Sequence, residues 1–381
     1  MTDPFRSPKG SYDPIPFADI DTRRRKLFEE IDRRLTNQLE ALEDGRSERW
    51  GYDTSSIAAY TRSTARNREH WLAFLTEWQE DRCDLQPRVE HIRDYNAFRL
   101  DRVWLLVRKD IEMDCLLLTP HGNGKRPAIV CQHGLNGTPE EACGFVDDYK
   151  RSGYNACGIR LAEEGFVVIA PHEVGGFGKP EPGCRFIADE PESEQYRART
   201  WLHRKAVILA VNLLGMELYH LSRAVDFLAS LEAVDPDRMG FYGLSQGGQS
   251  ALWFPAAETR MKATVCAAFF NHRMPKYVKH GGDKYTAYID TWEEDKFYWG
   301  QMLEFSDWQI MSLICPRAFM VEAGKLDKAA YWEMANEEFQ RGRQLYEDLG
   351  IGDRAEICIH DGGHINRCIE SIAFLKKWLM A

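Results

Sequence analysis

Long uninterrupted apolar runs are missing from this sequence of 381 residues. A membrane-spanning helix needs about 20 predominantly apolar residues in a row. No stretch reaches that length, so no membrane partner is expected. The start of the chain, Met1-Thr2-Asp3-Pro4, lacks the basic and apolar regions of a secretory signal and does not fit an acid-poor transit peptide. We therefore expect a cytoplasmic protein.

Cysteine pairs with the spacing of a metal or redox motif are also missing. The chain has ten cysteines but no C-x-x-C pair, which argues against a zinc ribbon or a thioredoxin-like site. Several cysteines lie inside apolar strand-like runs, where cysteine behaves as a small hydrophobic residue. Free thiols suit a reducing compartment.

Positive charge is in deficit, since the formal net charge is −10. This balance argues against nucleic acid and anionic membrane surfaces as partners. Hydrophobic residues make up 44% of the chain, which is enough for a buried core. The length suits two or three domains, or one large domain with an extension.

Residues 1–95 are predicted to form a helical N-terminal extension. After a proline-rich start, apolar residues recur near every fourth position, and a second stripe follows at helical spacing. The two stripes are Leu27, Ile31, Leu35, Leu39 and Leu42, and Trp71, Phe74, Leu75 and Trp78. The extension could pack over the active site, contact another subunit or add stability. Whether the chain forms a homo-oligomer is left open.

Residues 96–381 have the pattern of an α/β domain. Continuous apolar runs such as 127–132 and 166–170 are typical of strands buried on both faces, and they alternate with helical segments. This predicts a mostly parallel central sheet with helices on both faces. Residues 271–308 are too long for a simple connection and are predicted to form a lid-like insertion. Its aromatic residues Tyr288 and Trp292 are candidate substrate contacts.

The segment Gly243-Leu244-Ser245-Gln246-Gly247 lies between an apolar run and a helical run. In a strand–turn–helix context, Gly-x-Ser-x-Gly places the serine on a strained turn with its hydroxyl exposed. Ser245 is therefore the predicted nucleophile. The alternative is a glycine-rich loop that only joins two packed elements.

An acid and a histidine follow Ser245 at the ends of later predicted strands. In a parallel sheet, reactive groups gather beyond the carboxyl ends of the strands. The order Ser245, Asp327, His364 is the chain order of an α/β-hydrolase triad. His364 would accept the serine proton, and Asp327 would orient His364. The residues weighed as rivals are His360, Glu322 and Asp361.

Attack on a carbonyl creates an oxyanion that needs donors already in place. The backbone N–H groups of Gln246 and Leu135 are the predicted donors. His133, His172 and Glu173 also follow predicted strands and are candidate substrate contacts. A His-Glu pair can bind a metal, but no third ligand is spaced with it, so no metal and no cofactor are expected.

The motifs resemble those of α/β-hydrolase fold enzymes, in particular the acetyl xylan esterase and dienelactone hydrolase-like group. The resemblance covers residues 98–381 and is carried by 127–134, 226–228 with 235–238, 243–248, 315–318 and 362–364. It implies an α/β-hydrolase fold and esterase activity. The chain lacks the Arg-Gly-Gln motif of the related deacetylases and has Ile365 where they have glutamate.

The leading hypothesis is a serine hydrolase that cleaves a small carboxylic ester through an acyl-enzyme. A short acyl group is favoured, and an acetylated sugar is one candidate substrate. The second hypothesis is a C–C bond or amide hydrolase with the same triad, because FrsA-like enzymes also carry a helical extension. The third is a non-enzymatic interaction protein on a hydrolase scaffold.

Overall fold

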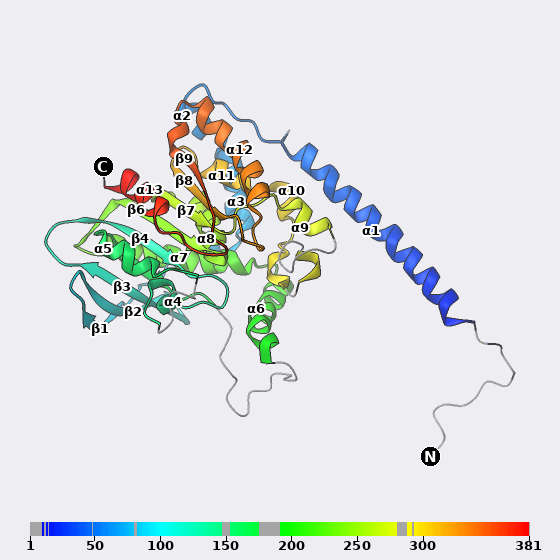
Figure 1. Ribbon diagram of the computed structural model, residues 1–381, viewed down its shortest axis with the longest axis horizontal. Helices are drawn as coiled ribbons and strands as arrows, with labels where there is room; N and C mark the ends of the chain where they lie inside the picture. The colour runs from blue at the N-terminus through cyan, green and yellow to red at the C-terminus, as the bar shows by residue number, and fades with distance from the viewer. Residues whose placement is uncertain are drawn as a thin grey trace, which may run out of the picture.

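The structure is a computed structural model that describes residues 10, 13, 15–47, 49–79, 82–146, 153–174, 191–279, 288–291 and 293–380. Within these ranges, the side chains of residues 44, 47, 79 and 191–198 are left out of the description. Most of the described residues form one layered α/β body, from which helix α1 extends outwards (Figure 1).

A nine-stranded sheet forms the centre of the body, with the strand order β1-β2-β3-β5-β4-β6-β7-β8-β9. The pairs β1–β2, β2–β3 and β3–β5 are antiparallel, and the remaining five pairs are parallel. The predicted mostly parallel α/β architecture is therefore confirmed. The strands are β1 (Arg88–Asp94), β2 (Phe98–Arg108), β3 (Ile111–Pro120), β4 (Arg126–Gln132), β5 (Val167–Pro171), β6 (Val234–Leu244), β7 (Met261–Ala267), β8 (Ala318–Gly324) and β9 (Ala355–His360).

Helices cover both faces of the sheet. Successive side chains of a strand point to opposite faces, so Val130 packs in one hydrophobic cluster while Ile129 and Cys131 pack in the other. The first cluster includes residues of α3 (Ala65–Phe74), α7 (Leu213–Ser230), α8 (Gln246–Ala257), α11 (Asp307–Ile314) and α12 (Trp332–Asp348). The second includes residues of α4 (Pro139–Cys143), α5 (Cys157–Glu163) and α13 (Glu370–Leu379).

The first 95 residues are not entirely helical, which corrects the predicted extension. They contain α1 (Phe17–Ser47), α2 (Ile57–Ser63), α3 and the 3-10 turn η1 (Glu77–Gln79), but also β1, the edge strand of the sheet. Every residue of β1 is exposed, so its sequence carries little of the apolar signal that marks a strand. Trp71 of α3 is fully buried and donates its Nε1–H to the Trp253 carbonyl oxygen of α8 at 3.3 Å. Helix α3 and strand β1 therefore belong to the same layered body as the rest of the sheet.

Residues 194–231 have a helical pattern along their length but form two helices. Helix α6 (Pro191–Ile208) ends before a turn in which Ala210 has a φ of +56°, and Asn212 caps α7 through its side chain. Ile208 and Leu209 are 84% and 72% exposed, although they lie in an apolar stretch of the sequence.

The insertion at 271–308 follows β7 and ends in the first turn of α11. Its described elements are α9 (Met274–Val278), η2 (Tyr288–Asp290), η3 (Glu294–Lys296) and α10 (Gln301–Glu304). The remaining short element, η4 (Gly352–Arg354), precedes β9. Among the described helices, none combines the length and the apolar character that crossing a bilayer requires.

Candidate active site

Ser245 lies on a sharp turn between β6 and α8. Its φ of 61° and ψ of −115° fall outside the regions that side-chain-bearing residues normally adopt, and such strain is concentrated at functional sites. The turn is tight because a Cβ on Gly243 would lie 2.0 Å from the Gly247 carbonyl oxygen. The Ser245 N–H donates to the Ala267 carbonyl oxygen at 2.9 Å, which ties the turn to β7.

Asp327 and His364 form a hydrogen-bonded pair. The Asp327 Oδ2 atom lies 2.9 Å from His364 Nδ1. The other carboxylate oxygen, Oδ1, accepts from the backbone N–H groups of Ala329 at 2.7 Å and Ala330 at 3.3 Å. The Asp327 side chain is fully buried, whereas that of His364 is 36% exposed. A carboxylate held in this way fixes the ring with a proton on Nδ1 and leaves Nε2 to accept another.

The loops that carry these two residues are joined by their backbones. The Lys325 N–H donates to the His360 carbonyl oxygen at 2.8 Å, and the Leu326 N–H donates to that of Gly362 at 3.0 Å. These bonds extend the parallel pairing of β8 and β9 past the ends of both strands. An acid and a histidine 37 residues apart are thereby brought into contact.

One cavity of about 420 Å³ brings the predicted triad together. Ser245, Asp327 and His364 all line it, together with Leu135 and Gln246, whose N–H groups were predicted to bind an oxyanion. Gln246 is the first residue of α8, where backbone N–H groups have no partner within the helix. The full lining is Leu135, Ser245, Gln246, Ala268, Phe269, Tyr288, Glu293, Lys296, Leu326, Asp327, Lys328, Ala329 and His364.

The three rival residues have other partners and do not line this cavity. His360 Nδ1 accepts from the Gly362 N–H at 3.0 Å. Glu322 accepts from the Tyr242 hydroxyl at 3.0 Å in the core. Asp361 forms an ion pair with Lys325 at 2.7 Å and lies on the outside of the loop.

Three predicted substrate contacts, His133, His172 and Glu173, do not line this cavity. His133 is buried between the Gly134 carbonyl oxygen and the Glu173 N–H, and its burial lowers the pKa of the imidazole to about 4. Glu173 is also buried and accepts from the Ser250 hydroxyl at 3.2 Å. His172 forms an ion pair with Asp114. The end of a strand sets the position of the backbone at the edge of the sheet, but not the direction of each side chain that follows.

Of the aromatic candidates, Tyr288 lines the cavity and Trp292 lies outside the described residues. The Tyr288 hydroxyl accepts from Arg273 Nη1 at 2.8 Å, and Arg273 forms an ion pair with Asp307. The ring is therefore held by a buried cation rather than free to turn.

Two charged residues of the insertion line the cavity and were missed by the sequence analysis. Glu293 and Lys296 lie at the η3 turn of the insertion, and both are largely buried. Lys296 Nζ donates to the side-chain Oε1 of Gln246 at 2.6 Å. The only signal was an acidic and basic run, Glu293-Glu294-Asp295-Lys296, within an aromatic segment, and such runs usually lie on solvated surfaces.

In the part of the chain that the structure describes, no group of three or more histidine, cysteine, aspartate or glutamate side chains could hold a metal ion.

Residues 65–289 match the family model for acetyl xylan esterase (AXE1). A protein of Bacillus subtilis (strain 168), YtaP, which is provisionally named a hydrolase, is 26% identical over 188 residues. That match covers 48% of this chain and about 60% of the length of YtaP.

Solved structures of esterases share the fold. A Bacteroides fragilis NCTC 9343 protein, provisionally named an acetyl xylan esterase, aligns with a TM-score of 0.64 at 17% identity and covers 82% of this chain and 78% of its own. The acetyl xylan esterase from Paenibacillus sp. R4 aligns with a TM-score of 0.54 at 19% identity, over 82% of this chain and 93% of that esterase. The glucuronoyl esterase from Solibacter usitatus aligns with a TM-score of 0.57 at 14% identity, over 86% of this chain and 98% of that esterase. These similarities confirm the predicted α/β-hydrolase fold.

Proposed function

The chain belongs to the acetyl xylan esterase family of carboxylic ester hydrolases, and we propose that it is a serine esterase that works through an acyl-enzyme. One observation carries the proposal. The serine of a strained strand-to-helix turn shares a single cavity with a hydrogen-bonded aspartate–histidine pair. That combination supplies a nucleophile, a base and an orienting acid.

In the first half of the reaction, His364 Nε2 takes the proton of the Ser245 hydroxyl as the oxygen attacks the ester carbonyl carbon. The N–H groups of Gln246 and Leu135 stabilise the oxyanion that forms. His364 then protonates the departing alcohol, which leaves an acyl group on Ser245. Asp327 stabilises the imidazolium in both transition states, since it lies 2.9 Å from Nδ1.

In the second half, water replaces the alcohol. His364 removes a proton from the water, hydroxide adds to the acyl carbon, and the same two N–H groups bind the new oxyanion. Collapse releases the carboxylic acid and returns the proton to Ser245. No cofactor takes part in these steps.

The substrate is a small ester with a short acyl group. A cavity of about 420 Å³ lies at the lower end of the usual range for small-molecule sites. Ala268, Phe269 and Leu326 offer apolar surface for the acyl part, while Glu293 offers polar atoms for an alcohol such as a sugar. Acetylated sugars therefore lead the set of candidate substrates.

The deciding experiment is replacement of the nucleophile. Ser245→Ala should lower kcat towards p-nitrophenyl acetate by at least about 1000-fold, with an unchanged unfolding temperature and no labelling by a fluorophosphonate. Ser230→Ala is the matched control, because Ser230 lies at the end of α7 and bonds to its own helix. Full activity in Ser245→Ala would refute the mechanism. A panel of acetyl sugars, β-diketones and aminoacyl amides separates ester, C–C and amide hydrolysis.

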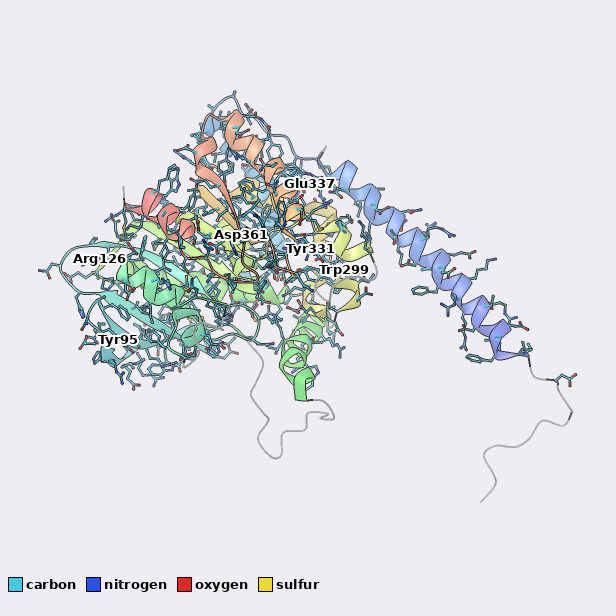
Figure 2. The ribbon with its side chains drawn as sticks, in the orientation of Figure 1. Tyr95, Arg126, Trp299, Tyr331, Glu337 and Asp361 are labelled. Carbon is cyan, nitrogen blue, oxygen red and sulfur yellow. The ribbon has the colours of Figure 1, made fainter. Side chains whose placement is uncertain are left out.

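A second copy of the chain is the proposed partner of α1. The helix is anchored at its C-terminal end, where Glu43 accepts from His272 Nε2 at 2.7 Å and Arg341 Nη1 at 2.9 Å. Its N-terminal part and side chains stand clear of the other drawn elements (Figure 2). The apolar residues there are exposed, namely Leu27, Phe28, Ile31 and Leu35 at 59%, 63%, 51% and 53%.

The spacing of this stripe suits another helix of the same kind. Phe28, Ile31, Leu35 and Leu42 follow steps of three, four and seven residues, the pattern of a coiled-coil seam. A helix with an uncovered apolar seam is marginal in water, and two copies related by a two-fold axis would cover both seams at once.

A cytoplasmic location is also proposed. The nine described cysteines are free thiols, and seven of them are buried. A reducing compartment keeps such thiols unpaired.

A further inference from the structure

A chain of buried charges runs from α7 to the active-site cavity. Glu217 of α7 binds Arg199 of α6 through two hydrogen bonds of 2.5 and 2.6 Å. Arg199 Nε donates to Asp295 Oδ2 at 2.6 Å, and the same oxygen lies 3.0 Å from Lys296 Nζ. Lys296 in turn donates to Gln246 Oε1 at 2.6 Å. Negative and positive side chains alternate from Glu217 to Lys296, which contacts the neutral amide of Gln246.

The arrangement is rigid because it is buried. The side chains of Arg199, Glu217, Asp295 and Lys296 are 1%, 2%, 5% and 6% exposed. A buried charge without a partner costs several kcal/mol, so each member is held in place by its neighbours. Burial alone would raise the pKa of Asp295, but Lys296 and Arg199 outweigh it and lower that pKa, which keeps the carboxylate charged.

The last members of this series of buried charges lie where the proposed chemistry takes place. Lys296 and Gln246 both line the cavity with Ser245. Gln246 follows the nucleophile directly, and its backbone N–H is a proposed oxyanion donor. A hydrogen bond that fixes the Gln246 side chain also restrains the peptide unit that carries this N–H.

We propose that Lys296 is a positioning residue of the active site, supplied by the insertion, which holds Gln246 so that its N–H points at the oxyanion. The ion pairs with Asp295, Arg199 and Glu217 hold Lys296 in turn. The insertion thus completes the oxyanion site as well as lining the cavity. This inference rests on the proposed esterase function.

The test is a double-mutant cycle on Lys296 and Gln246. Lys296→Met removes the donor, and Gln246→Ala removes the acceptor but keeps the backbone N–H. Loss of a direct oxyanion donor costs about 100- to 1000-fold in kcat, so an indirect effect of about 10-fold is expected for each variant. KM should change by less than about 3-fold. The double variant should be no slower than the slower single variant, because the two substitutions remove the same hydrogen bond.

Three measurements separate positioning from simple stability. Lys377→Met removes an exposed ion pair of the same length, with Glu356, and should leave kcat unchanged. Active-site titration with a fluorophosphonate gives kcat per folded site, so partial unfolding does not imitate the effect. Lys296→Arg, which keeps a charged donor, should recover most of the lost kcat.

Full kcat per titrated site in Gln246→Ala would overturn the proposal, even if Lys296→Met does not fold. Additive losses in the double variant would overturn it as well. Failure of the esterase proposal looks different, since the unchanged protein would then neither hydrolyse esters nor be labelled at Ser245.

Discussion

Gly324 and Gly363 lie so close that a Cβ on Gly324 would be 2.3 Å from the Gly363 carbonyl oxygen. Gly324 ends β8, three residues before Asp327, and Gly363 precedes His364. The contact between acid and histidine therefore depends on two backbones that approach without a side chain between them.

Gly324→Ala should separate these loops. The added methyl group meets backbone atoms that cannot rotate away, so we expect kcat to fall by about 10- to 100-fold through a misplaced His364. The unfolding temperature should also fall. Gly51→Ala is the control, because a Cβ there meets no atom within 4 Å. Kinetics with p-nitrophenyl acetate measure the effect, and equal activity of both variants would contradict the argument.

Asp327→Asn should impair catalysis while it preserves the fold. An amide in this position favours the wrong histidine tautomer and gives no charge to stabilise the imidazolium, so kcat should fall by about 10⁴-fold. Asp361→Asn, in the same loop region but paired with Lys325 outside the cavity, should change kcat by less than about 2-fold. Similar losses in the two variants would point to a general effect on the loops.

Glu322 should make stability depend on pH. Its burial raises the pKa of the carboxyl from 4.5 to about 7. Between these values the folded state binds a proton that the unfolded state has lost. The free energy of unfolding contributed by this group therefore decreases as pH rises from about 4.5 to about 7, by about 3 kcal/mol at most.

Glu322→Gln removes the titrating group and keeps an acceptor for the Tyr242 hydroxyl. Urea unfolding of both proteins at pH 5, 6, 7 and 8 should give a smaller decrease for the variant. Glu338 and Glu173 also have raised pKa values, so the difference between the two proteins is the relevant quantity. If the free energy of unfolding fell equally with pH in both proteins, Glu322 would not be the source of the pH dependence.

The α1 proposal predicts a dimer in solution. Light scattering should give about twice the 44.0 kDa of one chain at micromolar concentration. Ile31→Lys places a charge in the exposed seam and should yield monomers, whereas Asn37→Lys adds the same charge on the opposite side of the helix and should not. A monomeric unchanged protein would exclude this role for α1.

Much of the site could be predicted because its parts carry local signals. Ser245 lies within a glycine pattern that the turn requires sterically, and His364 follows two glycines at the end of a strand. Alternating apolar runs and helices predicted the sheet, and the sheet predicted that strand ends meet at one edge. The catalytic roles of these residues and the cytoplasmic location stay predictions.

Side-chain direction could not be predicted in the same way. His133 and Glu173 follow strands that end at the correct edge, yet their side chains turn into the interior and bond within it. Lys296 shows the reverse case, since a charged residue in a run that looks solvated is buried against Gln246. In both cases the decisive partners are distant in sequence.

The alternation of strands and helices after residue 96 and the serine turn were determined by the sequence, because they depend on periodicity and on short steric patterns. Tertiary structure decided which of the polar groups line the cavity. That choice depends on contacts between segments tens of residues apart, and on the cost of burying each charge without a partner of opposite sign.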